Sequence, residues 1–220
     1  MAIPLILAID TCEVTCSAAL VSGGHTLARR SERLGRGHAE RLLPMVSDLL
    51  AEASRSFEDL SRLVVSTGPG TFTGLRIGLS VARGLAVAKG IPCVGLMSLP
   101  VMAAQAGETG GVIHAIVMGR GGQGFYQAFE GLAPNGLPAQ LGPAACLDAE
   151  VIAEMIASRP GAVVGSGASL VGAVASIDSV DPSMLGQLGA SIEPDMYPPE
   201  PAYLRDADAK KGKALLPTEQ

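Results

Sequence analysis

The glycine-rich loop Thr67-Gly68-Pro69-Gly70-Thr71-Phe72-Thr73-Gly74 is the stretch of this sequence that decides the fold. Residues 63–66 before it are an apolar run of strand length, and the loop opens a helix predicted over residues 74–89. Gly90 is the residue type that most often ends a helix, and residues 91–96 form a second apolar run. A strand, a loop, a helix and another strand in this order are typical of an α/β unit.

Three strands and one helix are predicted before the loop. From His38 the apolar spacing becomes i, i+3, i+4 and i+7 and continues to Ala53, which indicates an amphipathic helix. Pro44 must lie in its first turns or kink it. Ser56, with Asp59 three residues later, forms a short helical cap before the next strand. The three strands cover residues 4–10, 16–21 and 26–32, with a turn over 22–25 between the last two.

The second half of the chain repeats this order of elements with almost no identity to the first half. A glycine turn over 119–124 joins two strands, and the glycine loop Gly165-Ser166-Gly167 again separates a strand from a helix. The sequence therefore predicts a duplicated α/β fold of two lobes, each with a mixed sheet flanked by helices. The predicted elements are strands at 112–117, 125–130 and 162–164, helices at 149–158 and 168–177, a loop over 131–143 and a connection over 102–111. We expect lobes at 1–105 and 106–195, with the tail 196–220 returning to the first lobe.

Composition restricts the class of protein. Of 220 residues, 48% are hydrophobic and 17% are charged, which excludes an intrinsically disordered chain. No apolar run reaches the roughly 18 residues of a membrane-spanning helix, and the N-terminus lacks the basic region of a signal peptide. We therefore expect a soluble, cytoplasmic protein with no membrane partner. The formal net charge of −5 predicts that the chain does not bind an RNA backbone unaided.

Two kinds of loop could hold a phosphate. Asp10 and Thr11 follow a predicted strand directly, a place where a carboxylate can meet a metal–phosphate and backbone N–H groups can meet phosphate oxygens. The competing interpretation, which we favour for Asp10, is a turn residue bonded to its own backbone. The long glycine loop is not a Walker A loop, because no Gly-Lys-Ser/Thr follows its glycines. The candidate nucleotide- or phosphate-binding residues are Asp10, Thr11, Gly68, Gly70, Thr71, Gly165 and Gly167.

The helix that the long loop opens has an unusual row of small residues. Gly74, Gly78, Ala82 and Ala86 recur every four residues and leave one face almost without side chains. Helix interiors lose roughly 1 kcal/mol for each glycine relative to alanine, so close packing must offset this loss. The row can pack on the chain's own 38–53 helix or on another subunit, and the two alternatives can coexist.

The sequence offers no catalytic or metal centre. If the halves descend from one unit, the residue that matches Asp10 in the second half is Met118, so a second carboxylate for phosphoryl transfer is missing. No Ser-His-Asp, Cys-His or His-x-x-x-His constellation occurs, and three histidines are scattered along the chain. We therefore predict no catalytic residue and no metal ligand.

Several motifs resemble the TsaB (YeaZ) family, the smaller subunit of the bacterial machinery that makes threonylcarbamoyladenosine at position 37 of tRNA. The resemblance covers essentially the full length of the chain but is strong only over the first hundred residues. It implies an actin-like (ASKHA, ribonuclease H-like) fold. The motifs are Leu7-Ala8-Ile9-Asp10-Thr11, His38-Ala39-Glu40-Arg41-Leu42-Leu43-Pro44, Thr67 through Gly78, and Pro201-Ala202-Tyr203-Leu204-Arg205.

The resemblance also implies a role. Family members act as non-catalytic subunits that dock a TsaD-type catalytic paralogue, with a TsaE-type ATPase in the complex, and form homodimers when alone. The tRNA would be contacted mainly through these partners. Ser98 and Met102 stand where the paralogue carries its two metal-binding histidines. No cofactor is implied as required, and weak nucleotide binding stays open. The residues expected at the partner interface are His38, Leu42, Met45, Gly74, Arg76, Gly78, Ala82 and Ala86.

An enzyme is the alternative function. A divergent ATPase or small-molecule kinase would use Asp10 and the two glycine loops, an interpretation that rests on fold analogy alone. A metalloprotease is a third hypothesis, but the sequence supplies no ligand set for it. Nucleotide titration and metal analysis distinguish these hypotheses from a scaffold.

Overall fold

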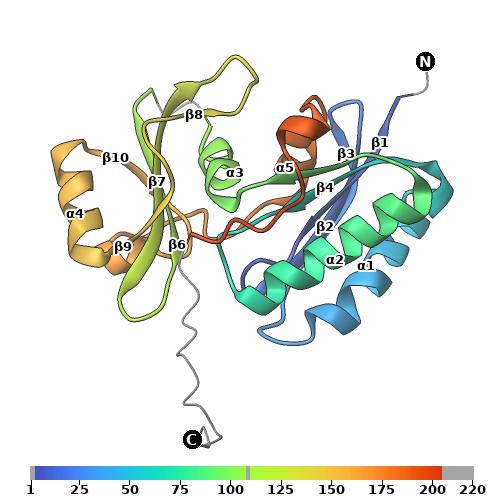
Figure 1. Ribbon diagram of the computed structural model, residues 1–220, viewed down its shortest axis with the longest axis horizontal. Helices are drawn as coiled ribbons and strands as arrows, with labels where there is room; N and C mark the ends of the chain where they lie inside the picture. The colour runs from blue at the N-terminus through green and yellow to red at the C-terminus, as the bar shows by residue number, and fades with distance from the viewer. Residues whose placement is uncertain (1–2, 108–109, 205–220) are drawn as a thin grey trace, which may run out of the picture.

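The computed structural model describes residues 3–107 and 110–204. Two β-sheets lie side by side, and helices cover their faces (Figure 1). The first sheet has the order β3-β2-β1-β4-β5. β1 pairs antiparallel with β2 and parallel with β4, so the sheet is mixed as predicted. Its strands are β1 (Leu5–Asp10), β2 (Thr15–Ser22), β3 (His25–Arg33), β4 (Leu60–Ser66) and β5 (Cys93–Leu96).

Alternation along β1 places helices on both faces of the first sheet. Leu5, Leu7 and Ile9 pack in a core with helices α1 (His38–Glu52) and α2 (Phe72–Lys89). Ile6 and Ala8 point into a second core, which includes Leu185 of helix α5 (Pro182–Gly189). A strand buried on both faces needs apolar residues at every position, and β1 has them up to Asp10.

The ends of α2 follow from local chemistry. The Thr71 side chain accepts a hydrogen bond from the Gly74 N–H at 3.2 Å and caps the N-terminus. Gly90 adopts the left-handed conformation, φ 62°, and ends the helix as predicted. The short helix η1 (Phe57–Asp59) has the expected capping box between Ser56 and Asp59.

The second sheet repeats part of this plan. β6 pairs antiparallel with β7 and parallel with β10, as β1 pairs with β2 and β4. Helix α4 (Ala149–Ser158) packs on the β7 and β9 side, in the position that α1 holds in the first lobe. The strands are β6 (Val112–Met118), β7 (Gln123–Leu132), β8 (Pro138–Gln140), β9 (Ala145–Asp148) and β10 (Gly161–Val164), with the order β10-β6-β7-β8 and β9 also on β7.

Two helices lie between the sheets. Helix α3 (Ser98–Gln105) contacts β6 and β7, and α5 contacts β1 and β2, while the two helices also contact each other (Figure 1). The lobe boundaries stay a prediction, yet α5 belongs to the 106–195 segment and packs on the first sheet. The chain therefore crosses back to the first lobe before residue 196.

The described part of the tail continues along the first sheet. The Gly95 N–H donates to the Tyr197 carbonyl at 2.9 Å, and the Ala202 N–H donates to the Thr67 carbonyl at 2.8 Å. These bonds hold residues 197–202 beside β5 and the long glycine loop. Residues 205–220 of the predicted returning tail lie outside the described residues.

Three sequence predictions need correction. The helix expected over 168–177 is only the 3₁₀ turn η2 (Ala168–Val171), because Gly172 adopts a left-handed conformation, φ 71°, that ends it. The connection expected over 102–111 includes the end of α3, and the loop expected over 131–143 contains β8. Helix α5 and the short turn η3 (Pro194–Met196) lie in a part of the sequence with no strong periodic signal.

Candidate functional site

Asp10 lies at the C-terminal end of β1 and is buried. Its Oδ1 accepts a hydrogen bond from the Cys12 N–H at 3.3 Å. Burial raises the pKa of the Asp10 carboxyl above its ordinary value, although the nearby Ser66 side chain and the hydrogen bond from Cys12 act in the opposite direction. A buried carboxyl that bonds its own turn is the arrangement that the competing interpretation, favoured from the sequence, predicts for Asp10.

The turn after Asp10 packs directly on the long glycine loop. The Thr71 N–H donates to the Cys12 carbonyl at 2.5 Å, and the Thr11 hydroxyl donates to the Gly74 carbonyl at 2.7 Å. A Cβ on Gly70 would lie 2.1 Å from the Cys12 carbonyl oxygen, so only glycine allows this approach. An anion site at the start of a helix needs unpaired N–H groups, and Thr71 has already given its N–H to the chain.

The second glycine loop is closed in a similar way. The Gly165 N–H donates to the Ile177 carbonyl at 2.7 Å, and the Gly167 N–H donates to the Ile116 carbonyl at 2.9 Å. Gly165 has φ 100°, and a Cβ there would lie 2.1 Å from the Ile116 carbonyl oxygen. These two glycines therefore serve close chain approach to β6, the structural alternative to phosphate binding.

The structure joins two residues that sequence reasoning missed. Ser166, from the second glycine loop, donates a short hydrogen bond to the Glu13 carboxylate, from the turn after β1. The Ser166 hydroxyl also accepts from the Met118 N–H at 3.0 Å. Glu13 and Ser166 are separated by 153 positions in the sequence, so no local pattern indicates this contact.

The small-residue row of α2 faces the interior of the chain. Gly74, Gly78, Ala82 and Ala86 are buried. A Cβ on Gly74 would lie 2.0 Å from the Thr11 carbonyl oxygen, and one on Gly78 would lie 2.5 Å from the Thr11 hydroxyl. The first half of the row, Gly74 and Gly78, therefore packs on the end of β1, and Ala82 and Ala86 belong to the core of the first lobe.

The residues predicted at a partner interface need correction for this reason. Leu42 and Met45 of α1 are fully buried, and His38 is 6% exposed. Together with the four small residues of α2 they belong to the interior of the first lobe. Arg76 alone among the predicted interface residues is exposed.

A different row of α2 faces solvent, and we call it the outer face of α2. Gly84 is exposed, and a Cβ there would meet no atom within 4 Å. Half-buried apolar side chains at 77, 81 and 85 flank this row, and Val87 is 84% exposed. Helix α1 lies beside α2 and exposes Leu43. The outer face of α2 consists of Ile77, Ser80, Val81, Gly84, Leu85, Val87 and Ala88.

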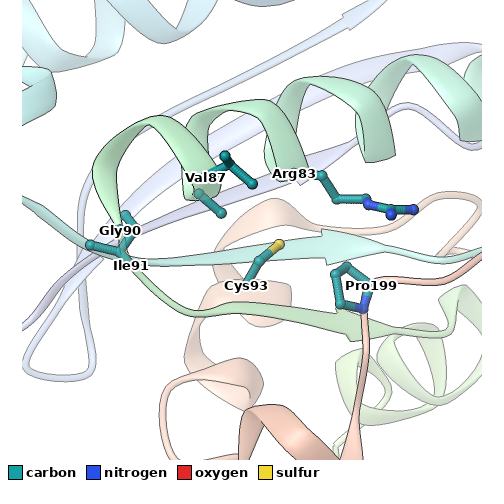
Figure 2. Close-up of a pocket in the computed structure, with 7 residues that line it drawn as sticks. Arg83, Val87, Gly90, Ile91, Cys93 and Pro199 are labelled. Atoms are coloured by element: carbon teal, nitrogen blue, oxygen red, sulfur yellow. The ribbon is translucent and has the colours of Figure 1, made fainter.

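Each end of α2 adds a feature to this surface. At the N-terminal end the Arg76 guanidinium lies 3.6 Å from the centroid of the exposed Phe72 ring, and Tyr203 lies beside both. At the C-terminal end is a shallow pocket of about 340 Å³, shown in Figure 2. The Cys93 side chain points from β5 toward the helix in this view. The pocket is lined by Arg83, Ala86, Val87, Gly90, Ile91, Cys93 and Pro199.

The described part of the chain offers no candidate metal centre. Within residues 3–107 and 110–204, no three His, Cys, Asp or Glu side chains are grouped so that they could hold a metal ion. Met118 ends β6 as Asp10 ends β1, so the position of a second carboxylate is occupied by a thioether. Ser98 and Met102 are buried in α3. The same described ranges contain no helix with the length and apolar character needed to cross a membrane.

Known proteins named for threonylcarbamoyladenosine formation in tRNA match much of the chain. The family model described as "TsaD: tRNA N6-adenosine threonylcarbamoyltransferase" matches residues 30–135. The "tRNA threonylcarbamoyladenosine biosynthesis protein TsaB" of Escherichia coli is 38% identical over 127 residues, which cover 57% of this chain and 54% of that protein. The Bacillus subtilis protein of the same name is 38% identical over 138 residues, which cover 61% of this chain and 60% of the relative. The chain therefore spans somewhat more than half the length of these curated relatives.

Two further relatives cover nearly all of the chain. A Mycobacterium bovis protein of unassigned function is 34% identical over 217 residues, or 94% of this chain and 95% of the relative. The solved structure titled "YeaZ from Pseudomonas aeruginosa" has a TM-score of 0.72 at 27% identity and covers 93% of this chain and 100% of that one.

The fold defines a class: an α/β protein with two mixed sheets flanked by helices, in which the second sheet repeats part of the plan of the first. The turn after β1 and the long glycine loop, which pack on each other, lie in two of the sequence motifs that resemble the TsaB family. The chain belongs to the TsaB (YeaZ) family.

Proposed function

We propose that this chain is a non-catalytic subunit in the formation of threonylcarbamoyladenosine in tRNA, and that it acts by docking a TsaD-type catalytic paralogue. The E. coli and B. subtilis relatives carry the name of this biosynthesis, and the matching family model is named for the transferase. Family membership supports the part of the proposal that concerns threonylcarbamoyladenosine formation. The surface of the chain supports the part that concerns docking.

The outer face of α2 is the observation that carries the proposal. Most exposed helix faces carry charged side chains, but this one combines small residues at 80, 84 and 88 with apolar residues at 77, 81 and 85. A row with little side-chain volume lets a second helix approach closely, and the flanking apolar side chains would lose water on contact. The pocket beside Val87 borders the same surface.

The partners follow from the same surface and from charge. A second copy of the chain could use the outer face of α2 when the paralogue is absent, which makes a homodimer the expected state in isolation. The net charge of −5 favours tRNA contact mainly through the paralogue. We further propose that a TsaE-type ATPase joins the complex and that the chain acts in the cytoplasm.

The closed loops support a non-catalytic role over the ATPase or kinase alternative. We expect titration of the chain with Mg²⁺·ATP to give no saturable heat up to about 1 mM nucleotide, because loop N–H groups at Thr71, Gly165 and Gly167 bond the chain itself. Isothermal titration calorimetry with a phosphate-release assay measures this. Saturable binding accompanied by ATP turnover would instead support the enzyme.

Sedimentation velocity tests the docking role. The chain and the TsaD-type protein of its own organism are run alone and as an equimolar mixture. We expect a 1:1 heterodimer to form at micromolar concentration, at the expense of any homodimer. Separate sedimentation of the two proteins across this range would contradict the proposal.

A further inference from the structure

The two exposed aromatic side chains of the protein lie together at the N-terminal end of α2. The chain has only four Phe and three Tyr residues. Phe72 and Tyr203 are each 54% exposed, whereas the others are buried or half-buried. The two ring centroids lie 6.1 Å apart, although one ring belongs to α2 and the other to the C-terminal segment. Exposed aromatic side chains are typical of protein interfaces, so this pair marks a candidate contact surface.

Arg76 joins the pair from the next turn of α2. Its guanidinium carbon lies 3.6 Å from the centroid of the Phe72 ring, and its Nε and Nη2 groups donate to the Tyr203 hydroxyl at 3.4 Å. The negative face of an aromatic ring attracts a cation placed over it. The Arg76 side chain is therefore ordered before a partner arrives, which reduces the entropy lost on binding. We call Phe72, Arg76 and Tyr203 the Arg76 cluster.

The segment that carries Tyr203 is held against the first lobe. The Ala202 N–H donates to the Thr67 carbonyl at 2.8 Å, directly before Tyr203. Further back, Gly95 lies so close to this segment that a Cβ would be 2.5 Å from the Pro198 carbonyl oxygen. The Arg76 cluster is therefore a preformed part of the folded chain.

The positive charge of Arg76 has no acidic partner in the parts of the chain that the structure describes. The guanidinium carries several N–H donors, and within residues 3–107 and 110–204 it donates only to the Tyr203 hydroxyl. The ion pairs of these ranges involve other cations. Arg76 can therefore still bind an anion.

The outer face of α2 leads directly to this charge. Phe72, Arg76, Ser80, Gly84 and Ala88 recur every four residues and are all exposed. A partner helix that packs along the small residues follows the same i±4 row and covers Arg76 at its end. Covering an arginine without a counter-ion is strongly unfavourable, so that partner must supply an anion. A carboxylate fits best, because it accepts two parallel hydrogen bonds from one guanidinium.

We infer that the Arg76 cluster binds an Asp or Glu carboxylate of the TsaD-type partner and thereby sets the position of that partner along α2. The inference rests on the proposed docking role and adds the kind of partner residue and its place. A second copy of this chain fits less well, because α2 contains no Asp or Glu. Two copies packed α2 against α2 could not supply the carboxylate from that helix.

Affinity for the TsaD-type protein of the same organism tests the inference. Arg76→Gln should weaken association about tenfold without a change in Tm. Its association should also depend less on salt than that of the wild type between about 50 and about 500 mM NaCl, because the screened ion pair is missing. Phe72→Leu keeps an apolar side chain but removes the ring beneath Arg76, and should weaken association about threefold. Arg120→Gln, in the exposed turn between β6 and β7, is the matched control and should bind as the wild type.

Carbodiimide cross-linking of the complex formed by Arg76→Lys identifies the carboxylate. A cross-link from position 76 to an Asp or Glu of the partner, located by mass spectrometry, supports the inference. A cross-link from position 76 only to this chain or to a second copy of it would overturn it. If no cross-link forms, the affinity of Arg76→Gln decides.

The two proposals fail in different ways. Equal affinity of Arg76→Gln and the wild type would overturn the role of the Arg76 cluster and leave the docking role intact, provided that Gly84→Arg still weakens association. A wild-type chain that does not associate with the TsaD-type protein would contradict both.

Discussion

Replacing Gly74 by alanine should destabilise the chain by about 3 kcal/mol or more and lower its Tm by roughly 10 °C. The added Cβ would lie 2.0 Å from the Thr11 carbonyl oxygen and 2.7 Å from the Thr71 hydroxyl that caps α2. The first contact is with backbone at the end of a buried strand, which cannot move without disturbing β1. The second removes a helix cap, itself a loss of about 1 kcal/mol. Chemical denaturation monitored by circular dichroism measures the change.

Gly84→Ala is the matched control on the same helix. Its Cβ would meet nothing within 4 Å, and Gly84 is exposed in the middle of α2. Alanine should therefore stabilise the chain by up to about 1 kcal/mol through helix propensity alone. Similar effects of the two substitutions would show that the small-residue row does not pack on the end of β1.

Gly84→Arg should weaken association with the TsaD-type partner at least about 100-fold, equivalent to roughly 2.7 kcal/mol, while leaving the Tm nearly unchanged. An arginine side chain at this open position fills the low centre of the outer face of α2 without touching the chain's own atoms. A partner helix could then no longer approach closely, and a buried charge would be left without a counter-ion. Sedimentation or biolayer interferometry with purified partner measures the loss.

Ala153→Arg provides the control for charge and size. Ala153 is exposed on α4 of the second sheet, so the same side chain is added to a helix outside the proposed surface. We expect association of this variant to match the wild type. If Gly84→Arg also binds as the wild type, the outer face of α2 is not the docking surface, and a position elsewhere must be sought.

Much of the first lobe could be predicted from local patterns. The helix expected over 74–89 is α2 (Phe72–Lys89), and the strand expected over 4–10 is β1 (Leu5–Asp10), because apolar period and turn residues determine both. Local patterns predict the second half of the chain less well. Residues 168–177 have a helix-like composition, but Gly172 takes a left-handed conformation that only the three-dimensional chain path explains.

The candidate interface shows where sequence reasoning stops. A small residue at every fourth position indicates that something packs closely on a helix, but it does not identify what packs there. Here the end of β1 packs against Gly74 and Gly78. The exposed row at Gly84 has no distinguishing pattern in the sequence. The contact between Glu13 and Ser166 lay beyond prediction because it depends on how the two lobes meet.

The same limit applies to the phosphate loops. Glycines in such loops either expose N–H groups to an anion or permit close chain approach, and the sequence pattern is the same for both alternatives. The structure favours close approach, since Gly70 and Gly165 lie so near carbonyl oxygens of Cys12 and Ile116 that no Cβ could fit.

A reconstituted modification assay tests the central claim most directly. Threonylcarbamoyl transfer to tRNA is measured with the TsaD-type partner and its other components, with and without this chain. Omission of the chain and addition of Gly84→Arg should each reduce product at least about tenfold, and Asp10→Asn, which keeps the Oδ1 acceptor for the Cys12 N–H, should support the wild-type rate. Full product without the chain, or loss of product with a folded Asp10→Asn variant, would contradict a non-catalytic docking subunit.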